Sequence, residues 1–158
     1  MLRKTTMKIV KAITILLATS IHLIAASVAE DKNNYNEIKI ASDCEWYKSN
    51  VRVLKGERFI IRKTAGGWTV DKKLYGKVGI AGHLDESITG LKNHFNLKYC
   101  EDAKFGQLLM YIADDERIIP VENGVITAYR GGYIFFRIND TTTEDNDGEL
   151  SVLIEKKN

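Results

Sequence analysis

The sequence predicts an all-β fold, a jelly-roll β-sandwich, and three observations point to this class. Apolar and polar residues alternate with a period of two in several short stretches, which is the pattern of strands with one buried face. Glycines separate these stretches at strand-and-turn intervals, whereas only one segment has the spacing of a helix. Several short strands with regular turn signals favour a sandwich or jelly roll.

The expected strands follow one another along the chain. They are NEIKIA (36–41), NVRVLKG (50–56), ERFIIRK (57–63), GQLLMYIA (106–113), GYIFFRIND (132–140) and GELSVLIEK (148–156). In the last of them, Leu150, Val152 and Ile154 share one face. Pro120 is the only proline. Because proline cannot donate to a strand ladder, we expect its segment at a sheet edge or at a bulge.

One segment departs from the strand pattern. Four apolar residues recur at spacings of four, three and four, which is one face of a helix: Leu84, Ile88, Leu91 and Phe95. Gly90 lies among them and costs about 1 kcal/mol in a helix. We therefore expect a short helix or a partly helical loop over 84–96, as an insertion that caps one end of the sandwich.

The start of the chain has the pattern of a secretory signal peptide. A basic beginning precedes an apolar run over 12–26, and small residues up to Ala29 suit cleavage after that position. A membrane anchor is the alternative, although the run is short for the ~20 residues of a spanning helix. We expect a signal peptide (1–29), a polar leader (30–36) and a β-sandwich domain (37–158). The mature protein would be exported, periplasmic or secreted, with no transmembrane segment after signal removal.

Two function classes find little support in the composition. Removing the signal peptide takes away four basic residues and no acidic ones, so the formal net charge changes from +2 to −2. No basic surface remains to bind nucleic acid. His83 and His94 are the only histidines after the signal, and the serines form no nucleophile motif. We therefore expect that the protein is not an enzyme.

Cys44 and Cys100 are the only cysteines. In an exported protein they can form one intramolecular disulfide. Two buried free thiols are the alternative, and the sequence leaves both open.

The polar stretch before the last expected strand is rich in oxygen donors. Its carboxylates and one of its amides belong to Asp140, Glu144, Asp145, Asn146 and Asp147. Calcium takes six to eight oxygens from such groups and from backbone carbonyls, but the register of an EF-hand is excluded because threonine and isoleucine stand where that motif needs acids. Carboxylates this close repel one another unless a cation or solvent separates them. On composition alone an ordinary polar turn is as good an interpretation, since Asp and Asn favour turns.

Aromatic residues near expected turns form a second theme, because sugar rings can pack their apolar C–H faces on aromatic side chains. Trp46 and Trp68 are the largest of these residues. The preferred interpretation is that both tryptophans belong to the core.

Four stretches occur in a particular order: AGGWTV (65–70), FGQLLMYIAD (105–114), IPVENG (119–124) and INDTTTEDNDGELSV (138–152). They resemble the Ala-Gly-Trp strand end, the Gly-x-Leu-x-Met-x-Ile strand, the Ile-Pro-Val-x-x-Gly turn and the ion loop of one family. This family comprises the calcium-dependent galactose-binding bacterial lectins of the LecA (PA-IL) type, within the wider galactose-binding-like domains. The resemblance covers about residues 37–155 and implies a jelly-roll β-sandwich.

The resemblance also implies a calcium ion that contacts two sugar hydroxyls directly. By position, the metal ligands would be Asp140, a threonine at Thr142 or Thr143, Asp145, Asn146 and the backbone carbonyl of Asp71. The sugar contacts would come from His83 and Glu86, in place of the family's His and Gln, and from Asp140 and Asn146. The loop is two residues shorter than in the family, so the threonine match is not fixed.

Together these features predict an exported, non-enzymatic bacterial protein that binds galactose-type glycans through Ca2+. A homo-oligomer is an expected form, because linked weak sites gain avidity. The alternative is a structural or protein-interaction module on the same sandwich that has lost sugar binding.

Overall fold

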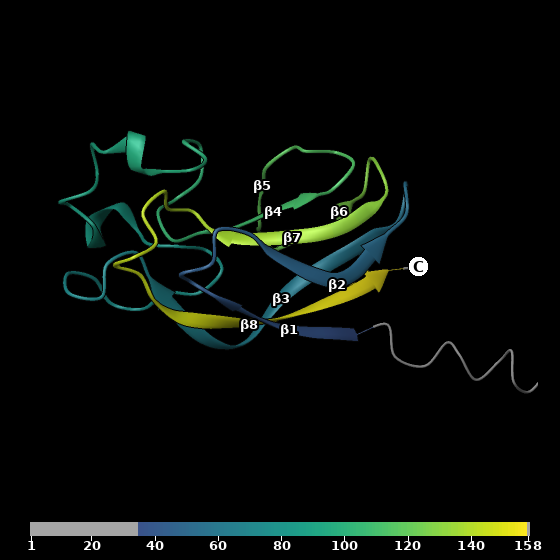
Figure 1. Ribbon diagram of the computed structural model, residues 1–158, viewed down its shortest axis with the longest axis horizontal. Helices are drawn as coiled ribbons and strands as arrows, with labels where there is room; N and C mark the ends of the chain where they lie inside the picture. Colours follow the sequence, from purple (N-terminus) through teal and green to yellow (C-terminus); the bar gives the residue numbers. More distant parts are fainter. Residues whose placement is uncertain (1–34, 158) are drawn as a thin grey trace, which may run out of the picture. The chain divides into compact units, whose positions relative to one another are not determined.

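The computed structural model describes residues 35–157 of the chain and the side chains of 37–157. The predicted signal peptide and the beginning of the predicted leader lie outside this part. The described chain forms two four-stranded antiparallel sheets, with almost no helix (Figure 1). The predicted all-β sandwich is therefore confirmed. Within the described residues, no helix is long and apolar enough to cross a membrane.

The first sheet has the strand order β1-β8-β3-β6 and the second β2-β7-β4-β5. The strands of the first sheet are β1 (Tyr35–Ala41), β3 (Arg58–Thr69), β6 (Ile126–Thr127) and β8 (Asp147–Lys157). Those of the second are β2 (Tyr47–Val53), β4 (Leu108–Ile112), β5 (Ile119–Pro120) and β7 (Gly132–Ile138). Pro120 thus lies in an edge strand, as its missing N–H predicts.

One hydrophobic core lies between the sheets, built from alternate residues of their strands. Ile38 and Ile40 of β1, and Val51 and Val53 of β2, are buried as the period-two pattern predicts. Trp68 is fully buried, and its indole N–H donates a 2.7 Å hydrogen bond to the Gly106 carbonyl. Trp68 is therefore a core residue, in agreement with the preferred interpretation of the sequence.

The topology brings several connections to one end of the sandwich. β3 and β8 pair along their length, with Thr69 opposite Asp147 at this end. In the other sheet, Leu108 at the start of β4 lies opposite Ile138 at the end of β7. The chain after β3, the chain before β4 and the β7–β8 loop consequently emerge together, as Figure 1 shows for the loops on the side away from the C-terminus.

The long connection between β3 and β4 does not contain one continuous helix. It forms two single turns of 3-10 helix, η1 (Asp85–Ser87) and η2 (Phe95–Leu97), so the partly helical loop is the correct alternative. Of the residues on the expected helical face, Ile88 is buried, whereas Leu84 and Phe95 are mostly exposed. Because this face has no continuous surface to pack against, the packing energy does not offset the unfavourable free energy of helix nucleation.

Cys44 and Cys100 are free and half-buried, so of the two alternatives that the sequence left open the structure has free thiols and no disulfide. The backbone of Cys100 is fixed without a covalent bond. Its N–H donates to the Asn139 side-chain oxygen at 2.8 Å, and its carbonyl accepts from the Asn139 amide at 3.0 Å.

Candidate functional site

The β7–β8 loop, residues 139–146, is held rigidly at its start. The Asn139 side chain is buried and bonds the backbones of Cys100 and Lys104. The Arg137 guanidinium donates to the carbonyls of Ile138 and Asp140, at 3.1 and 2.6 Å. Two buried side chains therefore fix the backbone from which the Asp140 carboxylate projects.

Neighbouring segments complete the support of the loop. The Thr141 N–H and hydroxyl both donate to the Leu97 carbonyl of η2, at 2.9 and 3.0 Å. The Lys72 N–H donates to the Asp145 carbonyl at 3.0 Å. The Asn146 amide donates to the Ser42 carbonyl at the end of β1, at 3.1 Å. The η2 turn, the chain after β3 and the chain after β1 therefore all form hydrogen bonds with the same loop.

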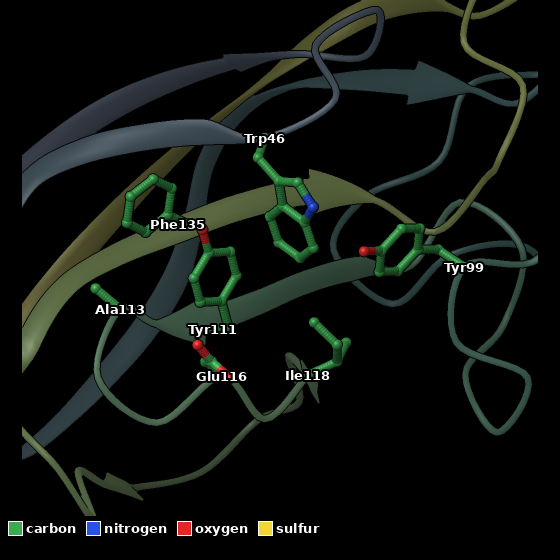
Figure 2. Close-up of a pocket in the computed structure, with 7 residues that line it drawn as sticks. All are labelled: Trp46, Tyr99, Tyr111, Ala113, Glu116, Ile118 and Phe135. Atoms are coloured by element: carbon green, nitrogen blue, oxygen red, sulfur yellow. The ribbon is translucent and has the colours of Figure 1, made fainter.

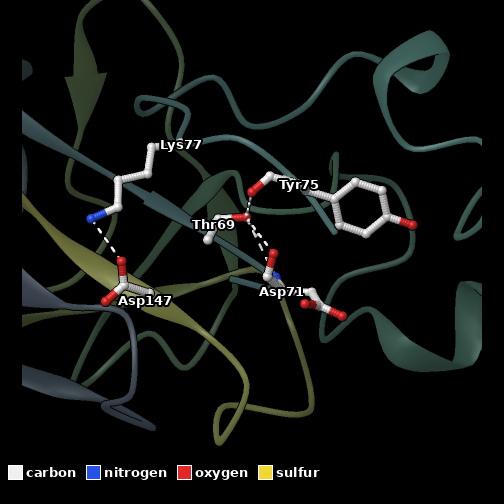
Figure 3. Close-up of polar contacts among 5 residues, drawn as sticks. All are labelled: Thr69, Asp71, Tyr75, Lys77 and Asp147. Atoms are coloured by element: carbon white, nitrogen blue, oxygen red, sulfur yellow. Dashed lines mark hydrogen bonds and ion pairs between the residues drawn. The ribbon is translucent and has the colours of Figure 1, made fainter. Parts of the chain in front are cut away.

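The acidic residues of the loop divide into two groups. Asp147 is exposed and forms an ion pair with Lys77 at 2.7 Å (Figure 3), which lowers its pKa. Glu144 is also exposed, and its carboxylate accepts from the Thr143 N–H at 3.1 Å. Asp140 and Asp145 instead turn inward and line the same small cavity.

Asp140 is in an environment that disfavours its charge. Its side chain is buried, with 4% of the residue exposed. The pKa of Asp140 is raised from its usual 3.8 to about 7, mainly by burial and in part by the nearby Asp145 carboxylate. The Thr142 N–H, which donates to the carboxylate at 3.2 Å, the Arg137 guanidinium and Asn146 oppose this shift only partly.

Two oxygens of this loop lack hydrogen-bond partners. They are Oδ1 of Asp145 and Oδ1 of Asn146, and both are buried. A buried acceptor without a partner costs about 1–3 kcal/mol. Together with the Asp140 carboxylate, whose charge is disfavoured by burial, these two oxygens form a group of acceptors that a cation would stabilise.

The cavity itself is small, with a volume of about 80 Å3. Its polar wall contains Asp140, Thr142 and Asp145, and its apolar wall comes from the β3–β4 connection and includes Val70, Leu74, Tyr75, Leu91, Leu97 and Phe105. Of the two threonines considered from the sequence, Thr142 lies against the cavity. Thr143 does not line it, and the Thr143 carbonyl accepts from the Asn146 N–H at 3.3 Å.

Asp71 lines the cavity, but its oxygens are already engaged (Figure 3). Its carbonyl accepts from the Tyr75 N–H at 3.0 Å and from the Thr69 hydroxyl at 3.2 Å. One carboxylate oxygen accepts from the N–H groups of Lys73 and Leu74, at 2.7 and 3.1 Å. To act as a metal ligand, the Asp71 carbonyl would have to lose at least one of its hydrogen bonds from Tyr75 and Thr69.

The structure does not bring His83 and Glu86 to the cavity. His83 is only 2% exposed, packs against the Tyr75 ring with centroids 5.9 Å apart, and has its pKa lowered by burial. Glu86 lies in η1 and is exposed. His83 Nε2 has no hydrogen-bond partner, but it is buried and does not line the cavity, so the predicted sugar contact of His83 has no support in this arrangement.

The described residues contain no group of three or more His, Cys, Asp or Glu side chains that could hold a metal ion. The carboxylates of Asp140 and Asp145 line the cavity, and Asn146, which does not line it, adds a buried amide oxygen without a partner in the same loop. Calcium accepts amide and backbone carbonyl oxygens and water as well as carboxylates. The partnerless oxygens and the raised pKa of Asp140 therefore fit calcium, provided that backbone oxygens or water complete the coordination.

Trp46 is half-buried and lies outside the hydrophobic core, so the preferred interpretation is wrong for this tryptophan. It belongs to an aromatic cluster that was not predicted from the sequence. Trp46, Tyr99, Tyr111 and Phe135 meet at a cavity on the opposite face of β4 and β7 from the core. Tyr111 and Phe135 are register partners on these strands, and their rings stack at 4.6 Å. Outward aromatic residues on adjacent strands are the signal in the sequence that could have indicated this surface.

These features define a β-sandwich with an oxygen-rich loop site at one end. No family model matches the chain, and no curated protein matches it in sequence. Among solved structures, the chain is similar to one described as "EclA N-terminal domain; PllA-like lectin", with a TM-score of 0.55 and 16% sequence identity. The similarity covers 78% of this chain and 98% of that chain. The protein therefore has a lectin-like fold.

Proposed function

We propose that the protein is an exported, non-enzymatic lectin that binds carbohydrate through a calcium ion at the β7–β8 loop. The observation that carries the proposal is the inward set of oxygens. Asp140 is buried with a raised pKa, and Asp145 and Asn146 each present a buried oxygen without a partner. This set lies on a fold that is similar to that of a PllA-like lectin.

Asp140, Asp145 and Asn146 would hold the ion, and an oxygen of Thr142 is the nearest candidate for a further ligand. A bound calcium ion would offer open coordination positions to vicinal sugar hydroxyls. The residues of this chain would supply the remaining selectivity. Asp140 and Asn146 are only 4% and 6% exposed, so the loop would have to open for them to exchange hydrogen bonds with the same hydroxyls. Leu74 presents an apolar surface beside the cavity. We propose galactose-type glycans as the ligands, following the resemblance of the loop.

Export through the predicted signal peptide belongs to the same proposal, since calcium is abundant outside the cytoplasm. A homo-oligomer would raise the avidity of weak single sites. Both statements are tested separately from sugar binding, by N-terminal sequencing of the secreted product and by light scattering.

The test is calorimetry of the mature protein against a glycan panel that includes galactosides, with calcium and with EDTA. The proposal expects heat from at least one glycan in calcium and none in EDTA. Asp140→Asn should lose this heat, whereas Asp147→Asn, in the same loop but paired outward with Lys77, should keep it. Glycan binding that is unaffected by EDTA and by Asp140→Asn would refute calcium dependence.

A protein-interaction module is the second candidate, and one observation favours it. Leu74, Leu84 and Phe95 are large apolar residues exposed on the β3–β4 connection, at 69%, 61% and 53%. If this surface were the functional one, Asp140→Asn would leave partner binding intact while Leu84→Ser and Phe95→Ser would abolish it.

A further inference from the structure

An aromatic cavity of about 330 Å3 opens on the outer face of the second sheet, separate from the calcium-type loop site. Figure 2 shows Trp46 between Tyr99 and Tyr111, with Phe135 beyond Tyr111. Trp46 precedes β2, Tyr99 follows η2, and Tyr111 and Phe135 belong to β4 and β7. The cavity thus collects aromatic side chains from four separate segments.

The rings are fixed in defined orientations. Trp46 stands edge-on to Tyr99, with centroids 5.5 Å apart and an interplanar angle of 84°, and edge-on to Tyr111 at 4.7 Å and 86°. Tyr111 and Phe135 are nearly parallel, with an interplanar angle of 10°. Tyr99 is nevertheless 45% exposed. The walls are therefore preorganised by ring–ring packing and still accessible from solvent.

The Arg137 guanidinium contacts two of these rings. Its guanidinium carbon lies 4.0 Å from the Tyr99 ring centroid and 5.4 Å from that of Trp46. Arg137 is itself buried and donates to the carbonyls of Ile138 and Asp140. Arg137 is therefore the cation–π partner of Trp46 and Tyr99. A ligand does not have to carry a positive charge to complete this interaction.

Glu116 provides a polar group at the edge of the same cavity. It is the only charged residue in the lining, which also includes Ala113 and Ile118. Its backbone has φ of +57°, the only left-handed conformation of a non-glycine residue in the described chain. This conformation is disfavoured for L-residues and recurs at functional sites. The Glu116 carboxylate is close enough to Tyr111 to contribute to the raised pKa of that phenol, after the larger effect of burial.

We propose that this aromatic cavity is a second, calcium-independent binding site for the pyranose ring of a glycan. A pyranose has an apolar C–H face and a rim of hydroxyl groups. The C–H face would pack on the indole and phenol rings. The hydroxyl groups would donate to the Glu116 carboxylate and exchange hydrogen bonds with the hydroxyls of Tyr99 and Tyr111. The cavity volume lies within the range of small-molecule sites.

The lining selects against other ligands of similar size. A wholly apolar ligand would make no hydrogen bond with the exposed Glu116 carboxylate or with the hydroxyls of Tyr99 and Tyr111 and would partly remove water from them, which is unfavourable. An organic cation would compete with Arg137 for Tyr99 and Trp46, whose rings already contact that guanidinium. A neutral polyhydroxylated ring satisfies the carboxylate and leaves the Arg137 contacts in place.

Tryptophan fluorescence gives a specific measurement, because Trp46 and Trp68 are the only tryptophans and Trp68 is fully buried. The probes are methyl glycosides of galactose, glucose and mannose together with lactose and cellobiose, titrated to ~50 mM in EDTA. We expect at least one to change the emission saturably and to protect Trp46 from acrylamide quenching. EDTA removes calcium-dependent binding, so this result is independent of the function proposed above.

Two variants and one control complete the test. Glu116→Gln should weaken the response at least fivefold with an unchanged fold, and Trp46→Phe should retain weaker sugar binding in saturation-transfer NMR. Glu122→Gln, an exposed glutamate outside the cavity, should bind like the parent protein. The inference is overturned if no sugar of the panel perturbs Trp46, if Glu116→Gln binds as tightly as the parent, or if tetramethylammonium binds more tightly than every sugar.

Discussion

Replacing Asp140 by asparagine should stabilise the protein in the absence of calcium, although it removes a residue of the proposed site. The folded protein holds the pKa of this carboxyl at about 7, against the usual 3.8, mainly through burial. Asparagine has nearly the same shape, carries no charge and can still accept a hydrogen bond from the Thr142 N–H through its side-chain oxygen.

The magnitude follows from the difference between the two pKa values. Because the folded state binds the Asp140 proton more tightly than the unfolded chain does, stability falls as the pH rises from about 4 to about 7 and then remains at the lower value. A shift of about 3 pKa units corresponds to about 4 kcal/mol at 1.36 kcal/mol per unit. Relaxation of the site around the charge reduces this figure, so Asp140→Asn should gain about 2–4 kcal/mol at pH 8.

The assay is urea unfolding of a protein that comprises residues 30–158, in EDTA, at pH 5 and pH 8. The gain should be present at pH 8 and should shrink at pH 5, where the parent carboxyl is already protonated. Calcium should raise the stability of the parent protein and leave Asp140→Asn unchanged. Asp147→Asn is the matched control: Asp147 is exposed and paired with Lys77, so neither its stability in EDTA nor its response to calcium should change much. If Asp140→Asn is less stable than the parent at pH 8 in EDTA, the carboxylate is not under electrostatic strain and the reasoning fails.

Three further predictions concern the framework of the two sites. Asn139→Ala leaves the N–H and the carbonyl of Cys100 without their partners and should cost about 2–4 kcal/mol in urea unfolding; a loss below 1 kcal/mol would show that water replaces the side chain. Gly148→Ala should prevent folding or lower the melting temperature by more than 10 °C, because a Cβ at φ +101° would overlap the Gly67 carbonyl; a thermal scan that matches the parent would contradict this. Glu116→Gly should raise stability by up to about 1 kcal/mol through relief of its left-handed backbone, and a destabilised variant would mean that the carboxylate stabilises the fold.

The sandwich could be predicted from the sequence because burial in strands follows a local period of two. Ile38 and Ile40 are buried as expected, and Pro120 lies in an edge strand. The helical spacing in 84–96 was less informative, because it depends on a surface for the helix to pack on. Of that face only Ile88 is deeply buried, and the chain makes two 3-10 turns instead.

The loop site could be predicted in part. The sequence indicated an acidic loop, but not which of its carboxylates turn inward, because that choice depends on partners distant in the chain. Asp147 forms an exposed ion pair with Lys77. The neighbouring Asn146 is buried, and its amide donates a hydrogen bond to the Ser42 carbonyl. Asp140 is turned inward on a backbone that Arg137 fixes.

The positions of His83 and Glu86 show the limit of transferring contacts by sequence spacing. Both residues were assigned only by their position in the resemblance, at and just before the 84–96 insertion, where the order of a few residues fixes the match. In the fold, the His83 backbone N–H donates to the Phe105 carbonyl at 2.8 Å, which holds the imidazole in the interior. The aromatic cavity was missed for a related reason, because Trp46 and Tyr99 meet only after both sheets have formed.

Calcium titration of a protein that comprises residues 30–158, by calorimetry at pH 7 and pH 9 in buffers of different ionisation enthalpy, tests the central claim most directly. Because the pKa of Asp140 is about 7, calcium should displace about half a proton per ion at pH 7 and almost none at pH 9. Binding at one site with this proton release is the predicted result. No calcium heat at either pH, or binding without proton release at pH 7, would contradict the assignment of the β7–β8 loop as a calcium site.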